Sequence, residues 1–505
     1  MKNMQIVFAG VLTAAFASFG EITIRSDYPG GNVKVCGIDE ANGVVRFAPD
    51  LRDTKGKWFH WDFTLRGAAG RKLRFEVPDA KYEYLSSLGP AISNDGGRTW
   101  TWLHPDGTRH EPANAFEYTF GPDENETRFT VSIPYSQKDW DAFTAKWRKS
   151  PDVKFDVLCK SQSGRRDTEL VRVPCRSKAK WLFVFTSRHH ACETSASPVV
   201  EGVFEELMSG SPEAKWLREN ADCLFVPFMD KDGVEEGDQG KNRRPHDHNR
   251  DYVAERYNSV KALKALVAKE SQGKRFVFID NHSPHVRSLP NGPEQDEIFS
   301  FGASDKQQNA VWNRFRRNWV ETQKGGELNY DSNFDIKAGK GYDKKVAAEC
   351  AKGLMTSCAW ASSLPNCYLA TCCEYGYSRC GGVYSFPAAR ELGGNMLKAL
   401  VRTVQTSLSC AGKASDTSAA PVPFKDAAKI KSWDAWDDAG KTPTTWNFKE
   451  KRCVTLEKIR KMSSGLEPAG QLETRPAKAI RSNMWSVGCE TLDRDYAYWN
   501  QDCRQ

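Results

Sequence analysis

The sequence predicts an α/β protein in which an N-terminal antiparallel β-sandwich is followed by a mixed, mostly parallel sheet flanked by helices. Two observations lead to this prediction. Between about residues 21 and 176, apolar and polar residues alternate in short runs that Gly, Pro, Asn and Asp separate, as in successive strands. After Lys178, apolar runs alternate with stretches of helical periodicity, which favours a parallel sheet with helices on both faces.

In the first region, apolar side chains recur at every second position of four segments. In the first segment Phe59, Trp61 and Phe63 face one way, and the polar residues between them face the other. Strands with a single apolar face bury it against a second sheet, so a β-sandwich is the natural closure. The four segments are 59–65, 73–77, 116–120 and 129–133.

The second region supplies buried strands and amphipathic helices in alternation. The expected strands are 181–185, 223–228, 276–280 and 368–372, and the expected helices are 198–208, 260–269, 310–322 and 388–404. After Cys410 the chain becomes rich in Ser, Ala and Pro, and then in Trp. The predicted organisation is therefore a signal peptide (1–20), a β-sandwich domain (21–176), an α/β domain (177–410) and a linker with a Trp-rich tail (411–505).

The N-terminus and the charge balance indicate an exported protein with neither a nucleic-acid partner nor a membrane span. Lys2 precedes an apolar run and then small residues, the pattern of a signal peptide, which predicts a periplasmic or extracellular location. No later run reaches the roughly 18–20 apolar residues of a membrane-spanning helix. The net charge of +7 comes from 72 basic and 65 acidic residues that lie scattered together. Fifteen cysteines would permit several disulfides and leave at least one thiol over.

A candidate metal site begins directly after the first strand of the second region. His190 and Glu193 stand three positions apart there, where both can turn toward one cation, although such a pair arises by chance in many proteins. His282, at the end of the strand 276–280, supplies a third ligand, because sites in open α/β sheets form at the carboxyl ends of strands. His285 is the alternative. Two imidazoles, one carboxylate and an open fourth position are typical of catalytic zinc.

Another strand brings a second carboxylate to the same edge of the sheet. Glu374 follows the strand 368–372. A carboxylate beside a zinc-bound water can accept its proton and deliver it to a leaving amine. This arrangement predicts metal-assisted hydrolysis, with Glu374 as the general base.

Five segments, taken in order, resemble those of the zinc metallocarboxypeptidase superfamily, and within it the cytosolic-carboxypeptidase-like branch. They are 188–194, 232–234, 247–250, 280–282 and 371–382, and the resemblance covers about residues 58–404. In the first segment, Ala191 and Cys192 replace the Pro and Gly of the family, and His248 replaces an apolar residue in the third. Because His246 and His248 add imidazoles nearby, an altered ligand set stays open.

The resemblance implies further roles by matching position. Asn249 and Arg250 would bind the terminal carboxylate of a substrate, which suits an amide donor and a planar guanidinium. Asp247 would hold the outer nitrogen of His190. Arg243 or Arg244 would polarise the scissile carbonyl group, and Arg243 is preferred.

The predicted function is that of a zinc metallocarboxypeptidase that acts on the C-terminus of a peptide or protein, at a peptide or isopeptide bond. One alternative with the same chemistry is an amidase or endopeptidase that cuts cell-wall peptides. Another is a protein that binds a peptide or glycan without hydrolysing it, although all the ligands and Glu374 are retained.

Overall fold

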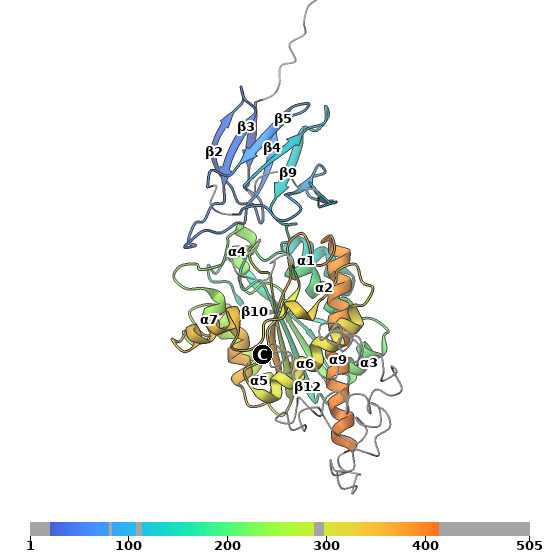
Figure 1. The fold of residues 1–505 in the computed structure, drawn as a ribbon. Coiled ribbons are helices and arrows are strands. Elements are labelled where there is room, and N and C mark those ends of the chain that lie inside the picture. Colours follow the sequence, from blue (N-terminus) through green and yellow to red (C-terminus); the bar gives the residue numbers. More distant parts are fainter. Residues whose placement is uncertain (1–20, 80–82, 108–113, 287–296, 414–505) are drawn as a thin grey trace, which may run out of the picture. The chain divides into compact units, whose positions relative to one another are not determined.

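The computed structural model describes residues 21–79, 83–107, 114–286 and 297–413. The chain divides into two compact units after Ser407, and the strands of the described ranges all belong to the first unit. The predicted signal peptide and residues 414–505 of the predicted linker and tail lie outside the described residues. Figure 1 shows the described elements along the chain.

Within the described part of the N-terminal region, nine short strands form two sheets. One sheet has the strand order β1-β4-β9-β6-β7 and is antiparallel, and the other has the order β2-β3-β5-β8, with β3 and β5 parallel. Their bounds are β1 Thr23–Arg25, β2 Lys34–Asp39, β3 Val44–Ala48, β4 Asp62–Arg66, β5 Lys72–Glu76, β6 Ala91–Ser93, β7 Thr101–Trp102, β8 Ala115–Thr119 and β9 Glu126–Thr130.

An aromatic core joins these two sheets. Phe47 of β3 meets Phe63 of β4 with ring centroids 5.1 Å apart, and Phe75 of β5 meets Phe129 of β9 at 5.0 Å. All four side chains are fully buried. The every-second-residue pattern of the sequence therefore places its aromatic residues between the sheets.

A seven-stranded mixed sheet follows, in the order β10-β11-β13-β12-β14-β16-β15. The four central strands β13, β12, β14 and β16 are parallel, and the pairs at both edges are antiparallel. The bounds are β10 Lys154–Lys160, β11 Asp167–Val173, β12 Trp181–Ser187, β13 Ala221–Val226, β14 Arg275–His282, β15 Phe299–Ser300 and β16 Cys367–Glu374. This sheet begins at Lys154, whereas the sequence places residues up to 176 with the first region.

Helices cover both faces of this sheet. Phe183 and Phe185 of β12 pack in a cluster with residues of α2, α6 and α9, and the alternate residues Leu182 and Val184 pack with α5 and α8. Long apolar strands that are buried on both faces are the mark of parallel sheets. The helices are α1 Gln137–Thr144, η1 Ala145–Trp147, α2 Ala196–Leu207, α3 Pro212–Asn220, α4 Lys231–Glu236, η2 His248–Arg250, α5 Asn258–Glu270, α6 Lys306–Gln323, η3 Ser332–Phe334, α7 Gly341–Cys350, α8 Ser357–Ser363 and α9 Phe386–Lys413.

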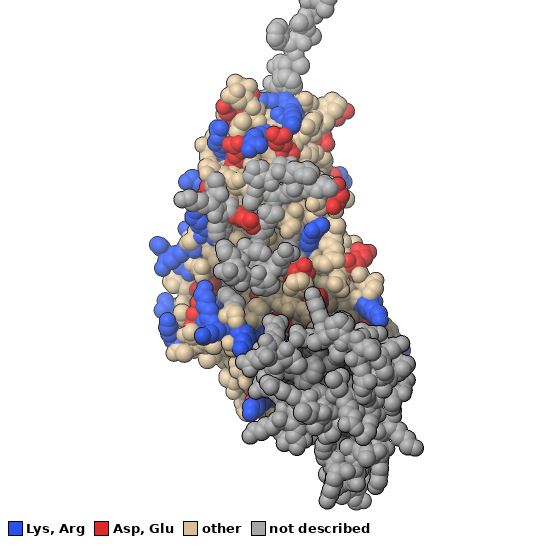
Figure 2. All heavy atoms as spheres, viewed as in Figure 1, with Lys and Arg blue, Asp and Glu red and all other residues tan. Residues whose placement is uncertain are grey.

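The predicted fold class is confirmed: one antiparallel and one largely antiparallel sheet precede a mixed sheet that helices flank (Figure 1). Among the residues that the structure describes, none of the helices has the length and apolar run needed to cross a bilayer. Eleven of the cysteines within the described ranges are free thiols. Acidic and basic side chains both occur across the face seen in Figure 2.

Candidate metal centre

The predicted metal ligands and Glu374 come from the carboxyl ends of three neighbouring parallel strands. The 188–193 loop follows β12, and His282 and Glu374 are the last residues of β14 and β16. In the sheet His282 lies directly opposite Glu374, and Ser187 lies opposite Asn281. Residues opposite each other on adjacent strands point to the same face, so the ladder itself brings these groups together.

Arg188 holds the loop after β12 in shape. Its backbone has a left-handed conformation, with φ of 59°. The buried guanidinium donates hydrogen bonds to the carbonyl oxygens of Ala191 and Tyr135, the latter at 3.0 Å, and to the Ser197 hydroxyl at 3.1 Å. This network offsets the strain of a left-handed residue and fixes the turn that carries His190 and Glu193.

His190, Glu193 and His282 form a compact group of potential ligands. The Nδ1 atoms of His190 and His282 lie 2.9 and 2.7 Å from the two carboxylate oxygens of Glu193, and the three ligand atoms lie within 4.8 Å of one another. Burial opposes ionisation of Glu193, but the charges of His190, Lys241 and His282 outweigh it and hold its pKa well below the ordinary value. Two nitrogens and one carboxylate oxygen match the donor set of a catalytic zinc site.

Each imidazole of this group has a carboxylate on its outer side. His190 Nε2 lies 3.2 Å from Asp247 Oδ1, and His282 Nε2 lies 2.8 Å from Asp280 Oδ2. Asp247 in turn accepts hydrogen bonds from the backbone N–H groups of Asn242 and Asn249 at 2.9 and 2.8 Å. Such partners fix the ring orientation and leave Nδ1 of each histidine to face a metal.

A second cluster of potential ligands consists of His189, Asp280 and His282. The side chains of His189 and Asp280 are already engaged in hydrogen bonds. His189 bonds Asp280 through Nδ1 at 2.9 Å and the Tyr252 hydroxyl through Nε2 at 2.7 Å. Asp280 also accepts from Thr186 at 2.8 Å and from Ser357. His189 is fully buried, whereas 12% of the His190 side chain is exposed. Because catalytic zinc needs an open position for water and substrate, the His190 group is the better candidate.

Glu374 stands beside the His190 group in a buried setting. Within the described residues its Oε2 atom is buried without a hydrogen-bond partner, and its Oε1 lies 3.7 Å from the thiol of Cys372. Burial raises the pKa of Glu374, and the neighbouring Glu193 carboxylate raises it further, while the charge of His282 opposes them. A carboxylate with an uncommitted oxygen and a raised pKa is suited to accept a proton.

Arg243, the residue preferred for polarising the scissile carbonyl group, is already paired with acids in the structure. Its Nε and Nη2 atoms lie 3.0 and 2.7 Å from carboxylate oxygens of Asp53 and Asp238, and Nη1 bonds Asp230. Three acids thus surround one guanidinium, of which 9% is exposed. The sequence around Arg243 does not reveal its pairing with Asp53, because Asp53 lies far away in the chain.

The predicted carboxylate binders lie next to the metal group. The side-chain amide of Asn249 lies 3.0 Å from His282 Nε2, and its oxygen accepts from the Ser357 N–H at 2.9 Å. Arg250 forms an ion pair with Glu349 of α7 at 2.8 Å. His285, the alternative ligand, instead packs against Phe59, with ring centroids 4.9 Å apart.

Lys241 is a functional candidate that sequence reasoning misses. Its Nζ lies 2.6 Å from Glu193 Oε1 and donates to the Ser283 carbonyl at 3.0 Å. In the sequence it begins the basic run Lys241-Asn242-Arg243-Arg244, and a charged run is usually a solvated surface. Gly240 before it is the available signal, since a glycine in a loop often marks a close backbone approach.

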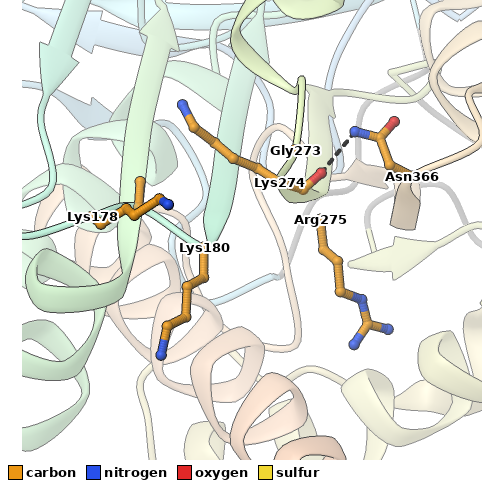
Figure 3. Close-up of a pocket in the computed structure, with 7 residues that line it drawn as sticks. Lys178, Lys180, Gly273, Lys274, Arg275 and Asn366 are labelled. Atoms are coloured by element: carbon orange, nitrogen blue, oxygen red, sulfur yellow. Dashed lines mark hydrogen bonds between the residues drawn. The ribbon is translucent and has the colours of Figure 1, made fainter.

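A separate hollow lies at the opposite edge of the same sheet. It has a volume of about 510 Å³ and is lined where β12, β14 and β16 begin, by Lys178, Ala179, Lys180, Gly273, Lys274, Arg275 and Asn366 (Figure 3). The Asn366 amide donates to the Lys274 carbonyl at 2.7 Å. Because the His190 group lies at the carboxyl ends of these strands, this hollow is not the predicted site.

Comparison with known proteins identifies the family. The sequence profile of the zinc carboxypeptidase family matches residues 144–337, a range that contains the 188–194 loop, Asp247 and His282. The chain therefore carries a domain of the zinc carboxypeptidase family. Within it, cytosolic carboxypeptidase 2 of Danio rerio is 31% identical over 221 residues, which are 41% of this chain and 27% of that protein.

Further carboxypeptidases are similar to the chain in sequence or in fold. Cytosolic carboxypeptidase 6 of Caenorhabditis elegans is 21% identical over 288 residues, 52% of this chain and 62% of that protein. The chain thus spans less than two thirds of the length of these curated relatives. Metallo-carboxypeptidases from Burkholderia cenocepacia and Pseudomonas aeruginosa share its fold with a TM-score of 0.61, at 18% and 22% identity, over 76% of this chain and 99% of theirs.

Zinc, the predicted cofactor, is confirmed as the metal of this superfamily, and the donor atoms present fit it. His190 and His282 would supply imidazole nitrogens and Glu193 a carboxylate oxygen, with Asp247 and Asp280 behind the rings. The candidate ligands, which the sequence places at separate strand ends, thus form one group in space.

Proposed function

We propose that the protein is a zinc-dependent carboxypeptidase that hydrolyses the C-terminal peptide or isopeptide bond of a peptide or protein. The observation that carries the proposal is the convergence of His190, Glu193 and His282, with ligand atoms within 4.8 Å of one another, beside the buried carboxylate of Glu374. The superfamily makes zinc the metal, and when bound it lowers the pKa of a water molecule and polarises a carbonyl group.

Glu374 is the proposed general base and then the general acid. It accepts a proton from the attacking water, the water oxygen bonds to the carbonyl carbon, and the carbon–nitrogen bond breaks as Glu374 returns the proton to the leaving amine. The raised pKa of Glu374, caused first by burial, brings its proton affinity closer to that needed for both steps at neutral pH. The proton that leaves the water thus ends on the amine, and Glu374 returns to its starting state.

Asn249 and Arg250 are the proposed binders of the substrate's terminal carboxylate. Arg250 is held by Glu349, an acid that a substrate carboxylate can replace at the same guanidinium. Exchange of one carboxylate for another keeps the charge of Arg250 paired, so binding does not leave it isolated. Preference for the C-terminus then follows from charge, because internal peptide bonds carry no carboxylate.

Glu374→Gln tests the proposal. The variant keeps all three ligands and loses the proton acceptor, so we expect normal zinc content and a fall in kcat of several orders of magnitude. Release of C-terminal residues from a peptide library, read by mass spectrometry, measures activity, and metal analysis measures zinc. Asp222→Asn is the matched control, because it makes the same acid-to-amide change at the other edge of the sheet, where Asp222 pairs with Lys274.

The products also separate the alternatives. Loss of single residues from the C-terminus supports the proposal, cleavage of internal or cell-wall peptide bonds supports the related amidase or endopeptidase, and binding without cleavage supports a non-catalytic role. Activity in Glu374→Gln equal to the wild type would remove Glu374 from the mechanism.

We further propose that the protein is exported to the periplasm or the extracellular space. The proposal rests on the sequence pattern of residues 1–20, which lie outside the described residues. N-terminal sequencing of the mature protein from culture fractions tests it, and an intact Met1 in the cytoplasmic fraction would contradict it.

A further inference from the structure

We propose that Lys241 is a catalytic residue whose ammonium group receives the carbonyl oxygen of the scissile bond, the role that the family resemblance gives to Arg243. The inference rests on the proposed carboxypeptidase function and adds a residue to it. The ammonium stays protonated throughout and donates hydrogen bonds as negative charge develops on that oxygen.

Lys241 lies inside the metal centre. Its Nζ contacts Glu193 Oε1 at 2.6 Å and the Ser283 carbonyl at 3.0 Å, and 11% of its side chain is exposed. The ring of Trp58 lies 5.4 Å from the ammonium. A buried lysine that touches a metal-ligand candidate is a costly arrangement, because desolvation of an ammonium must be offset by its partners.

The loop before Lys241 is shaped to deliver this side chain. Gly240 has φ of 75°, and a side-chain carbon at this position would collide with the backbone nitrogen of Ala191. Gln239 binds the ligand loop as well, since its carbonyl accepts from Cys192 N at 3.2 Å. The chain therefore passes directly against the segment that carries His190 and Glu193, and the next side chain reaches Glu193.

The other cations near the site have different partners. Arg243 is surrounded by Asp53, Asp230 and Asp238. Arg188 holds the Ala191 carbonyl in the 188–193 loop, and Arg250 pairs with Glu349. Lys241 differs from them because its carboxylate partner, Glu193, is itself a proposed zinc ligand.

Metal binding changes what Lys241 can do. Glu193 Oε1 faces both His190 Nδ1 and Lys241 Nζ. A divalent ion at this carboxylate would compete with the ammonium for the same negative charge and would repel it. The ammonium, which has three donors, keeps the Ser283 carbonyl and has donors left for a substrate oxygen.

The test compares Lys241→Met, which keeps the length of the side chain and removes its charge, with Lys231→Met. Lys231 is a matched control because it is also a buried lysine paired with a carboxylate, Glu235, but on α4. We expect Lys241→Met to lower kcat/KM roughly 100- to 1,000-fold, with zinc affinity, measured by chelator competition, equal to or tighter than in the wild type. Lys241→Arg should recover part of the loss, and Lys231→Met should keep kcat/KM per folded molecule.

Three outcomes would overturn the inference. Unchanged kcat/KM in Lys241→Met removes the residue from catalysis, and joint loss of zinc and activity shows that it supports Glu193 instead. If Arg243→Lys lowers kcat/KM as much as Lys241→Met does, with an unchanged unfolding midpoint, then Arg243 is the residue that receives the carbonyl oxygen. These results differ from a failure of the proposed function, in which the wild type itself releases no C-terminal residue and both proposals fall.

Discussion

The candidate metal centre is built from two regions that are held in place by different means. The strand ends of the mixed sheet supply His282 and Glu374, and the 188–193 loop starts at the end of β12. The hydrogen-bond ladder between β12, β14 and β16 sets the spacing of these strand ends. The segment 237–250 between α4 and α5 supplies Lys241, Asp247, Asn249 and Arg250, but it contains no strand and only the short helix η2.

The loop between β3 and β4 of the N-terminal region contacts this second region. Lys55 N donates to the Asn242 carbonyl at 3.2 Å, Thr54 forms a β-bridge with Arg243, and Arg52 pairs with Asp238 at 2.7 Å. The Gln239 side chain bonds both the N–H and the carbonyl of His60, at 2.8 and 2.7 Å. The mixed sheet therefore positions the metal ligands, whereas the N-terminal region positions the groups that surround metal and substrate.

The largest expected difference between the two regions is in zinc affinity, when a ligand at a strand end is replaced and when a residue of the 237–250 segment is replaced. His282→Ala should weaken zinc binding by far more than 100-fold, because one of three protein ligands is lost. Asp247→Asn removes only the charge behind His190 and should weaken it roughly 10- to 100-fold. Chelator competition measures both, and equal losses would erase the proposed distinction between the two regions.

A pH effect is expected from the contact between the N-terminal region and the loop. Burial lowers the pKa of His60 from 6.5 to about 4. The folded state therefore binds fewer protons than the unfolded state between these values, so stability is present above pH 6.5 and is lost as the pH falls toward 4. The loss is on the order of 3 kcal/mol. Denaturant unfolding of the wild type and of His60→Gln across this range measures it, and parallel curves would contradict it.

A smaller change is expected when one anchor of the loop is removed. Gln239→Ala leaves the N–H and carbonyl of His60 without their partner and should lower the free energy of unfolding by about 1–2 kcal/mol, since water can enter the vacated space. Zinc affinity should stay close to that of the wild type, because the strand ends are untouched. A large fall in zinc affinity would show that the loop, and not the sheet, sets the ligand geometry.

Particular elements show where sequence reasoning stops. The predicted strands match β12, β14 and β16 closely, because runs such as 276–280 are apolar and end in polar residues. The sequence groups β10 and β11 with the first region, because an alternating strand looks the same at the edge of either sheet. The acids around Arg243 come from Asp53, Asp230 and Asp238, and no local pattern links the first of these to the loop.

Local periodicity is enough to predict the fold class, and motifs a few residues long single out His190, Glu193, His282 and Glu374 as strand-end candidates, whose roles stay predictions. Tertiary packing sets which cation stands beside Glu193 and what supports that cation. This choice depends on contacts between segments almost two hundred residues apart, such as Gln239 with His60, whose energies arise only when both are packed together.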